Sequence, residues 1–190
     1  EINADETNRI SLNDDELNRV LGGGLVPGSI VLIGGEPGVG KSTLLLQISL
    51  SLNLKVLYVT GEESIQQIKL RSNRLNSDSN KCYVFNETNV ESITHQINSV
   101  NPDLIIIDSI QTLHTDILDS SPGSVSQIKE STSSFLNFAK KTNIPFIIVG
   151  HITKDGGIAG PKVLEHMVDV VLHFEGDKNY VYRILCSKKK

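Results

Sequence analysis

Short apolar runs alternate along the chain with stretches in which apolar residues recur every three or four positions. This alternation predicts β-strands separated by α-helices. The run 104–107 is apolar at every position, which is typical of a strand buried on both faces, as in a parallel sheet. The predicted strands are residues 30–33, 56–60, 82–85, 104–107, 145–149, 170–174 and 180–185, and the predicted helices are residues 41–52, 64–75, 90–100 and 124–141.

The order of these elements predicts an α/β fold. Strands joined by helices of this length form right-handed crossovers, so we expect a central, mostly parallel sheet flanked by helices. The last two predicted strands are joined by residues 176–179 with no helix between them, which predicts an antiparallel hairpin at the end of the sheet. Ser124 and Gln127 together predict a capping box at the start of the last helix.

The first 29 residues differ from the rest of the chain. They are polar and acidic, and they end in Gly22-Gly23-Gly24 and Pro27-Gly28, so we expect a lead-in segment and turns rather than a separate domain. Residues 30–190 are then predicted to form a single core domain. The chain begins with Glu1 and shows no signal-peptide pattern, which favours a domain taken from a longer protein.

Composition and charge are those of an ordinary globular protein. The 190 residues suffice for one α/β domain, and the net charge of −4 does not indicate a nucleic-acid binder, although a local basic loop would suffice to contact phosphates. No apolar run approaches the roughly 20 residues that span a membrane. Cys82 and Cys186 belong to no Cys-x-x-Cys pair, so we expect buried free thiols rather than a metal site or disulfide.

A phosphate-binding loop follows the first predicted strand. Residues 35–42 satisfy the pattern G-x-x-x-x-G-K-[S/T], and an apolar helix continues from them. Glycines let backbone N–H groups converge on phosphate oxygens at a helix N-terminus. Lys41 is expected to reach the β- and γ-phosphates and Ser42 to ligate Mg²⁺. The predicted nucleotide-binding residues are Gly35, Glu36, Pro37, Gly38, Val39, Gly40, Lys41, Ser42 and Thr43.

Two acidic positions follow other strands. Asp108 ends the buried run 104–107, which is the arrangement of a Walker B strand, so Asp108 is predicted to be the second Mg²⁺ ligand. Glu62 and Glu63 follow the strand 56–60, and a carboxylate there would point toward the γ-phosphate. Glu62 is the candidate general base. Glu63 suits better a solvated acid in the first turn of the next helix, but the sequence barely separates the two.

Several segments together resemble the RadA (Sms) family. They are Leu21-Gly22-Gly23-Gly24-Leu25-Val26-Pro27-Gly28-Ser29, the phosphate-binding loop, Gly61-Glu62-Glu63-Ser64, Asp108-Ser109-Ile110-Gln111-Thr112, Pro122-Gly123-Ser124-Val125-Ser126-Gln127, Gly150-His151-Ile152-Thr153-Lys154 and residues 158–169. The resemblance covers residues 9–187. It is far more specific than a phosphate-binding loop alone.

The resemblance implies a RecA-like P-loop ATPase that uses ATP and Mg²⁺. It also implies a homo-oligomeric ring, a hexamer, which binds single-stranded or branched DNA and drives branch migration in recombinational repair beside a RecA-type recombinase. By position, Glu62 resembles the family's catalytic glutamate and His151 its γ-phosphate sensor, although His151 alone could equally be a packed histidine.

The resemblance also implies two DNA-contacting loops, near residues 111–127 and 152–162. The second loop carries the cations and glycines Lys154, Gly156, Gly157 and Lys162, which could track a phosphate backbone. It has no aromatic residue, so backbone contact is expected there rather than base stacking.

The chain departs from the family pattern at both ends. The family's four-cysteine zinc ribbon and its Lon-protease-like domain lie outside it, and Lys188, Lys189 and Lys190 stand where a Lys-Asn-Arg-Phe-Gly motif would begin. Independent DNA unwinding is therefore not assigned. The expected compartment is the bacterial cytoplasm, with an organelle as the alternative.

The residues alone leave several other functions to be compared with this one. Another RecA-type motor, of the replicative-helicase or clock-protein kind, would not explain the segment 158–169. A GTPase would need an Asn-Lys-x-Asp motif, and a small-molecule kinase an arginine-rich lid, but the chain has neither. A nucleotide-gated DNA-binding scaffold with negligible hydrolysis is the non-enzymatic alternative.

Overall fold

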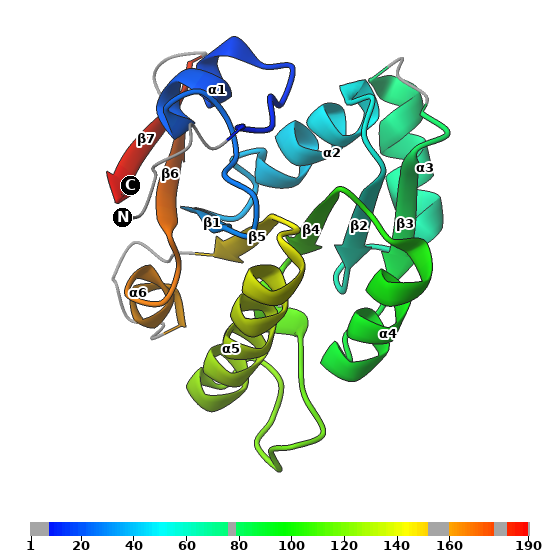
Figure 1. The fold of residues 1–190 in the computed structure, drawn as a ribbon, viewed down its shortest axis with the longest axis vertical. Helices are drawn as coiled ribbons and strands as arrows, with labels where there is room; N and C mark the ends of the chain where they lie inside the picture. The colour runs from blue at the N-terminus through cyan, green and yellow to red at the C-terminus, as the bar shows by residue number, and fades with distance from the viewer. Residues whose placement is uncertain (1–7, 76–78, 152–159, 177–181, 190) are drawn as a thin grey trace, which may run out of the picture.

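The computed structural model describes residues 8–75, 79–151, 160–176 and 182–189, which form one seven-stranded sheet (Figure 1). The strand order is β3-β2-β4-β5-β1-β6-β7, and every neighbouring pair is parallel except β6 and β7. The predicted parallel α/β sheet with an antiparallel final pair is confirmed. The strands are β1 Ile30–Gly35, β2 Val56–Thr60, β3 Cys82–Asn86, β4 Leu104–Asp108, β5 Phe146–His151, β6 Val170–Gly176 and β7 Arg183–Lys189.

Helices cover both faces of this sheet, as Figure 1 shows. Apolar residues of α1, α2 and α3 pack against one face, and those of α4, α5 and α6 against the other, which creates two hydrophobic cores. The central strands β1, β2 and β4 are buried at every position, which explains their continuous apolar runs. The helices are α1 Asp15–Leu21, α2 Lys41–Ser51, α3 Ile65–Arg74, α4 Val90–Val100, α5 Val125–Thr142 and α6 Gly160–Glu165, with a 3₁₀ turn, η1, at Ile110–Thr112.

The last strand lies further along the chain than predicted. Of the predicted range 180–185, Tyr182 precedes β7, and residues 180 and 181 lie outside the described part. The strand instead continues to Lys189, paired with β6 through Lys189 opposite Val171. The prediction followed side-chain polarity and ended at Leu185, shortly before the polar residues from Ser187 onward. Backbone pairing at an exposed edge does not require apolar side chains, so the strand continues through the lysines.

Helix α1 lies in the segment expected to hold only a lead-in and turns. Asp14 caps its start, where the carboxylate accepts a hydrogen bond from the Leu17 amide at 2.8 Å, and Gly22 ends it in the left-handed region. Leu17 and Leu21 are buried against the core. The acidic composition of residues 14–16, which suits a helix N-terminus, hid a helix of two turns.

The predicted capping box at Ser124 is only half formed. The Ser124 hydroxyl accepts from the Gln127 amide at 3.3 Å, but the Gln127 side chain turns away from the helix end. The complete box stands at the start of α3, where Ser64 and Gln67 bond reciprocally.

Gln127 instead holds the long loop between η1 and α5. Its Oε1 accepts from the Thr115 amide at 2.8 Å, and its Nε2 lies 3.2, 3.0 and 2.9 Å from the carbonyl oxygens of Thr115, Leu118 and Ser120. Because only 1% of Gln127 is exposed, no solvent replaces these bonds. One buried amide therefore ties together backbone groups from three positions of the loop.

The two cysteines are free, as predicted, but they are half-buried rather than buried. Both lie on the outermost strands, Cys82 on β3 and Cys186 on β7, where helices cover the sheet less completely. Burial is still sufficient to raise the pKa of the Cys82 thiol to about 11, which keeps it protonated and unreactive.

We expect Gln127→Ala to lower the free energy of unfolding by about 2 to 4 kcal/mol, because it leaves several buried backbone groups of the loop without partners. Urea unfolding monitored by circular dichroism would measure this loss. The exposed Gln66 of α3 offers a matched control, for which Gln66→Ala should change stability by less than about 0.5 kcal/mol. Equal effects of the two changes would contradict the assignment.

Candidate nucleotide-binding site

Four neighbouring strands end at one edge of the sheet, and each carries a predicted site residue there. The strands β2, β4, β5 and β1 are adjacent and parallel. Strand register places Gly35 opposite His151, and Asp108 opposite Thr60, two residues before Glu62. Ligands of open α/β sheets collect at the carboxyl ends of the strands. The sheet thus gathers the predicted site from four separate stretches of sequence.

The backbone of the phosphate-binding loop requires its glycines. A Cβ atom on Gly35 would lie 2.3 Å from the carbonyl oxygen of Phe174 on β6, closer than any packing allows. Gly40 has a φ of 108° and caps α2 without a side chain of its own to bond the first-turn N–H groups of this helix. These donors point out of the helix end and are suited to a phosphate.

Lys41 is held inside the loop. Its ammonium donates to the carbonyl oxygens of Gly35 and Glu36, each at 2.8 Å, and only 3% of the residue is exposed. Burial lowers the pKa of Lys41, while the nearby carboxylates of Asp108 and Glu62 act in the opposite direction. The lysine and both predicted acids therefore converge at one place.

Asp108 is a buried carboxylate with one oxygen engaged. Its Oδ2 accepts a hydrogen bond from the Tyr58 hydroxyl at 2.6 Å, and its Oδ1 has no hydrogen-bond partner among the described residues. Ser42 lies half-buried in the first turn of α2, and its carbonyl oxygen is 3.5 Å from the same hydroxyl. Sequence reasoning missed Tyr58, because a tyrosine inside an apolar strand gives no signal beyond core packing.

These groups fit Mg²⁺. A carboxylate oxygen and a serine hydroxyl are the hard oxygen ligands that Mg²⁺ takes, with the remaining positions filled by phosphates and water. In the described part of the chain, no cluster of three or more histidine, cysteine or acidic residues would hold a metal by itself. Asp108 and Ser42 supply two such ligands, which leaves the other positions to the phosphate oxygens of a nucleotide and to water.

Glu62 and Glu63 face different surroundings. Glu62 Oε1 accepts a hydrogen bond from the hydroxyl of the buried Ser109 and lies 2.9 Å from Nε2 of His151. Glu63 pairs with Arg71 of α3 at 2.8 Å. Glu62 thus lies in the polar cluster at the strand ends, whereas Glu63 is tied to a helix; the assignment of the general base to Glu62 stays a prediction.

The hydrogen bond from His151 is the main reason why the pKa of Glu62 is lowered, with Ser109 and Lys41 acting in the same direction against partial burial. Glu62 is thus an ionised acceptor at neutral pH. The other ring nitrogen of His151 is buried, with no partner among the described residues.

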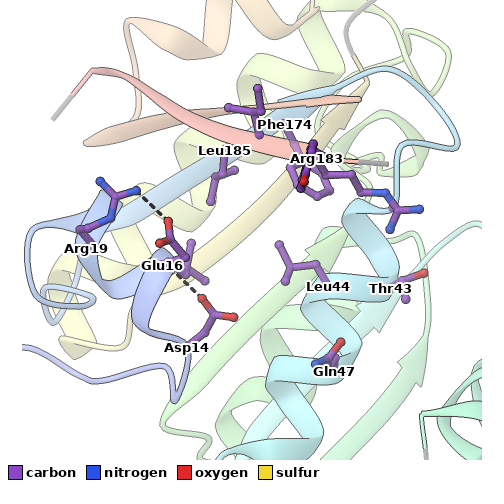
Figure 2. Close-up of a pocket in the computed structure, with 13 residues that line it drawn as sticks. Asp14, Glu16, Arg19, Thr43, Leu44, Gln47, Phe174, Arg183 and Leu185 are labelled. Atoms are coloured by element: carbon purple, nitrogen blue, oxygen red, sulfur yellow. Dashed lines mark hydrogen bonds and ion pairs between the residues drawn. The ribbon is translucent and has the colours of Figure 1, made fainter. Parts of the chain in front are cut away.

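A cavity of about 690 Å³ opens beside the phosphate-binding loop, between α1, α2 and the β6–β7 pair. Figure 2 shows Arg183 of β7 reaching across it toward the start of α2, near Thr43. A Cβ atom on Gly40 would lie 3.0 Å from the Arg183 guanidinium. The ion pair between Arg19 and Glu16, at 2.7 Å, lies on the side of the cavity formed by α1. Arg183 and Gln47, which also lines the cavity, were not found from the sequence, because no motif marks them.

The predicted DNA-binding residues are described only in part. Lys154, Gly156 and Gly157 lie outside the described residues, and Lys162 is described only as a position in α6. The loop 111–127 is described; it contains Asp116 and Asp119 and no lysine or arginine.

Among the described residues, no helix is long and apolar enough to cross a membrane.

A family model described as an AAA domain matches residues 1–157. The chain belongs to the AAA domain family. The predicted resemblance to RadA is confirmed by curated relatives named DNA repair protein RadA. The chain is 54% identical to the one from Listeria monocytogenes, 56% to that of Halalkalibacterium halodurans and 50% to that of Bacillus subtilis, over 100%, 95% and 99% of its own length.

The chain spans less than half the length of these relatives, 42%, 40% and 42% respectively. Among solved structures, a KaiC-like protein from Pyrococcus horikoshii matches with a TM-score of 0.76, covering 96% of this chain and 88% of that one at 18% identity. At that identity the match establishes the fold alone. The predicted α/β core is confirmed at the level of family and fold.

We expect His151→Ala to raise the pKa of Glu62 toward the ordinary glutamate value, because the hydrogen bond that favours the carboxylate is lost. Titration of the carboxyl carbons by NMR would measure the change. His173→Ala serves as the control, since His173 forms a similar 2.9 Å contact with Glu175 on β6, away from this cluster. A Glu62 pKa that does not move would refute the assignment.

Proposed function

We propose that this chain is the ATP-hydrolysing core of a DNA-repair ATPase of the RadA type. The observation that carries the proposal is the meeting, at four adjacent strand ends, of the phosphate-binding loop, Asp108 with one unengaged oxygen, and the Glu62–His151 pair. The relatives' name, DNA repair protein RadA, supports the DNA-repair part.

Each group has a role in hydrolysis. The α2 N-terminus and Lys41 bind the β- and γ-phosphates, for which the ammonium exchanges its bonds to the Gly35 and Glu36 carbonyls. Asp108 and Ser42 hold the Mg²⁺, which neutralises charge on the phosphates when bound. Glu62 orients and deprotonates the attacking water. His151, in contact with Glu62, senses the γ-phosphate.

The nucleoside belongs in the cavity beside the loop. Thr43 and Gly40 line it next to the phosphate-binding backbone, and about 690 Å³ accommodates a base and ribose. The Arg183 guanidinium, which lies over Gly40, supplies a cation near the phosphates and a planar surface for a base. Adenine as the preferred base follows from the RadA resemblance and not from a hydrogen-bonding pattern in the cavity.

Two substitutions test this proposal. Lys41→Ala should abolish ATP binding, because it removes the cation of the loop. Glu62→Gln should keep ATP binding but lower turnover at least about a hundredfold, as expected for loss of a general base. Equilibrium binding of a fluorescent ATP analogue and phosphate release would measure both.

Glu63→Gln is the matched control, since Glu63 is the neighbouring acid that pairs with Arg71. It should retain turnover within about threefold. If Glu63→Gln stops hydrolysis and Glu62→Gln does not, the base has been assigned wrongly. Nucleotide binding with no measurable turnover in the unaltered full-length protein would favour the nucleotide-gated scaffold.

We assign DNA contact to the second of the two loops, residues 152–162. The loop 111–127 has an acidic tip, which disfavours phosphate contact, whereas Lys154 and Lys162 are cations in the second loop and at its end. Gly156 and Gly157 allow backbone N–H groups to approach phosphates. The RadA resemblance supports the rest of the proposal. The protein would form a hexameric ring in the bacterial cytoplasm and bind single-stranded or branched DNA. It would drive branch migration together with a RecA-type recombinase.

We expect single-stranded DNA to stimulate ATP hydrolysis by the full-length protein, and the double variant Lys154→Ala/Lys162→Ala to bind DNA more weakly with a shallower dependence on salt. Loss of two phosphate contacts reduces the slope of log K against log salt by roughly 1.4 for a single strand. Fluorescence anisotropy from low to physiological salt would measure the slope, with Lys140→Ala/Lys141→Ala at the end of α5 as control. An unchanged slope would reject the loop assignment.

A further inference from the structure

Tyr58 brings a polar group into a fully buried strand of the sheet. It lies on β2, and its ring is fully buried in the hydrophobic core between the sheet and α2 and α3. A phenylalanine would fill the same apolar space. A buried hydroxyl costs free energy unless it is hydrogen-bonded, so the interaction of this hydroxyl indicates what the residue does.

The hydroxyl lies near both residues that are predicted to hold the metal. It is 2.6 Å from Oδ2 of Asp108 and 3.5 Å from the carbonyl oxygen of Ser42. A phenol has one proton, and the shorter distance to a charged acceptor means that it donates to Asp108. The Ser42 carbonyl is then a neighbour rather than the partner.

The hydrogen bond from Tyr58 fixes the orientation of the Asp108 carboxylate. Rotation of an aspartate about its last torsion is soft, so an unsupported carboxylate would point either oxygen at the site. With Oδ2 engaged by Tyr58, Oδ1 is the oxygen left without a partner. Because Asp108 is only 3% exposed, water does not readily replace the phenol as the donor.

We propose that Tyr58 is a positioning residue, whose hydroxyl fixes one oxygen of Asp108 so that the other is presented to the Mg²⁺ of the bound nucleotide. This inference rests on the proposed function, since it takes Asp108 as a metal ligand. Groups that orient metal ligands in this way raise metal affinity without touching the metal.

Tyr58→Phe tests the proposal, because it removes the hydroxyl and keeps the ring. The readout is the affinity for a slowly hydrolysed fluorescent ATP analogue, measured once across a Mg²⁺ titration and once in EDTA. Tyr58→Phe should raise the Mg²⁺ concentration needed for half-maximal binding about tenfold and leave binding in EDTA unchanged. Tyr83→Phe, on the neighbouring strand β3 with an exposed ring, should change neither.

Asp108→Asn separates this proposal from the one it rests on. If Asp108→Asn leaves the Mg²⁺ dependence unchanged, Asp108 is not a metal ligand and the proposed metal site fails. If Asp108→Asn shifts the Mg²⁺ dependence and Tyr58→Phe does not, the proposed metal site is supported, but the proposed role of Tyr58 is wrong. Equal weakening by Tyr58→Phe in Mg²⁺ and in EDTA would show that the hydroxyl only supports the fold.

The unaltered protein offers a second measurement, should Tyr58→Phe fail to fold. The proposal expects the Tyr58 hydroxyl proton to give an exchange-protected NMR resonance both without ligand and with Mg²⁺ and the ATP analogue. Disappearance of that resonance when Mg²⁺ and the analogue bind would mean that the bond to Asp108 breaks in the loaded state, and it would overturn the proposal.

Discussion

Burial of the central strands on both faces is the constraint on which the rest of the molecule depends. Strands β1, β2 and β4 are buried at every position because two helical layers enclose them. A one-residue slip in their register would move each strand-end group relative to its neighbours. The hydrophobic cores therefore set the positions of the polar groups at the strand ends, although they contain almost none of them.

The charged side chains of the site are held in place without a bound ligand. The carboxylates of Asp108 and Glu62 favour the charged form of Lys41, and Lys41 lowers the pKa of Glu62. Each of the three is also held by a neutral partner: a carbonyl oxygen, a phenol or a serine hydroxyl. Such anchoring reduces the reorganisation required when a charged ligand enters, which is the physical basis of electrostatic preorganisation.

The sequence predicted what depends on local pattern. The phosphate-binding loop, the parallel strands and the places of Asp108 and Glu62 just after two of them follow from motif spacing and apolar runs. Tyr58 and Arg183 could not be found in this way, because their roles arise from strand order and from β7 folding back beside the loop. Helix α1 was hidden by its polarity, and the end of β7 by backbone pairing that continues beyond the apolar residues.

The side chain of Gln127 bonds to backbone atoms of the loop that it holds, namely the Thr115 amide and the carbonyl oxygens of Thr115, Leu118 and Ser120. Backbone groups are the same whatever side chains the loop carries. The tip, including the 71% exposed Ile117, can therefore change its surface chemistry during evolution without changing its path. One conserved amide would leave the neighbouring positions free to diversify.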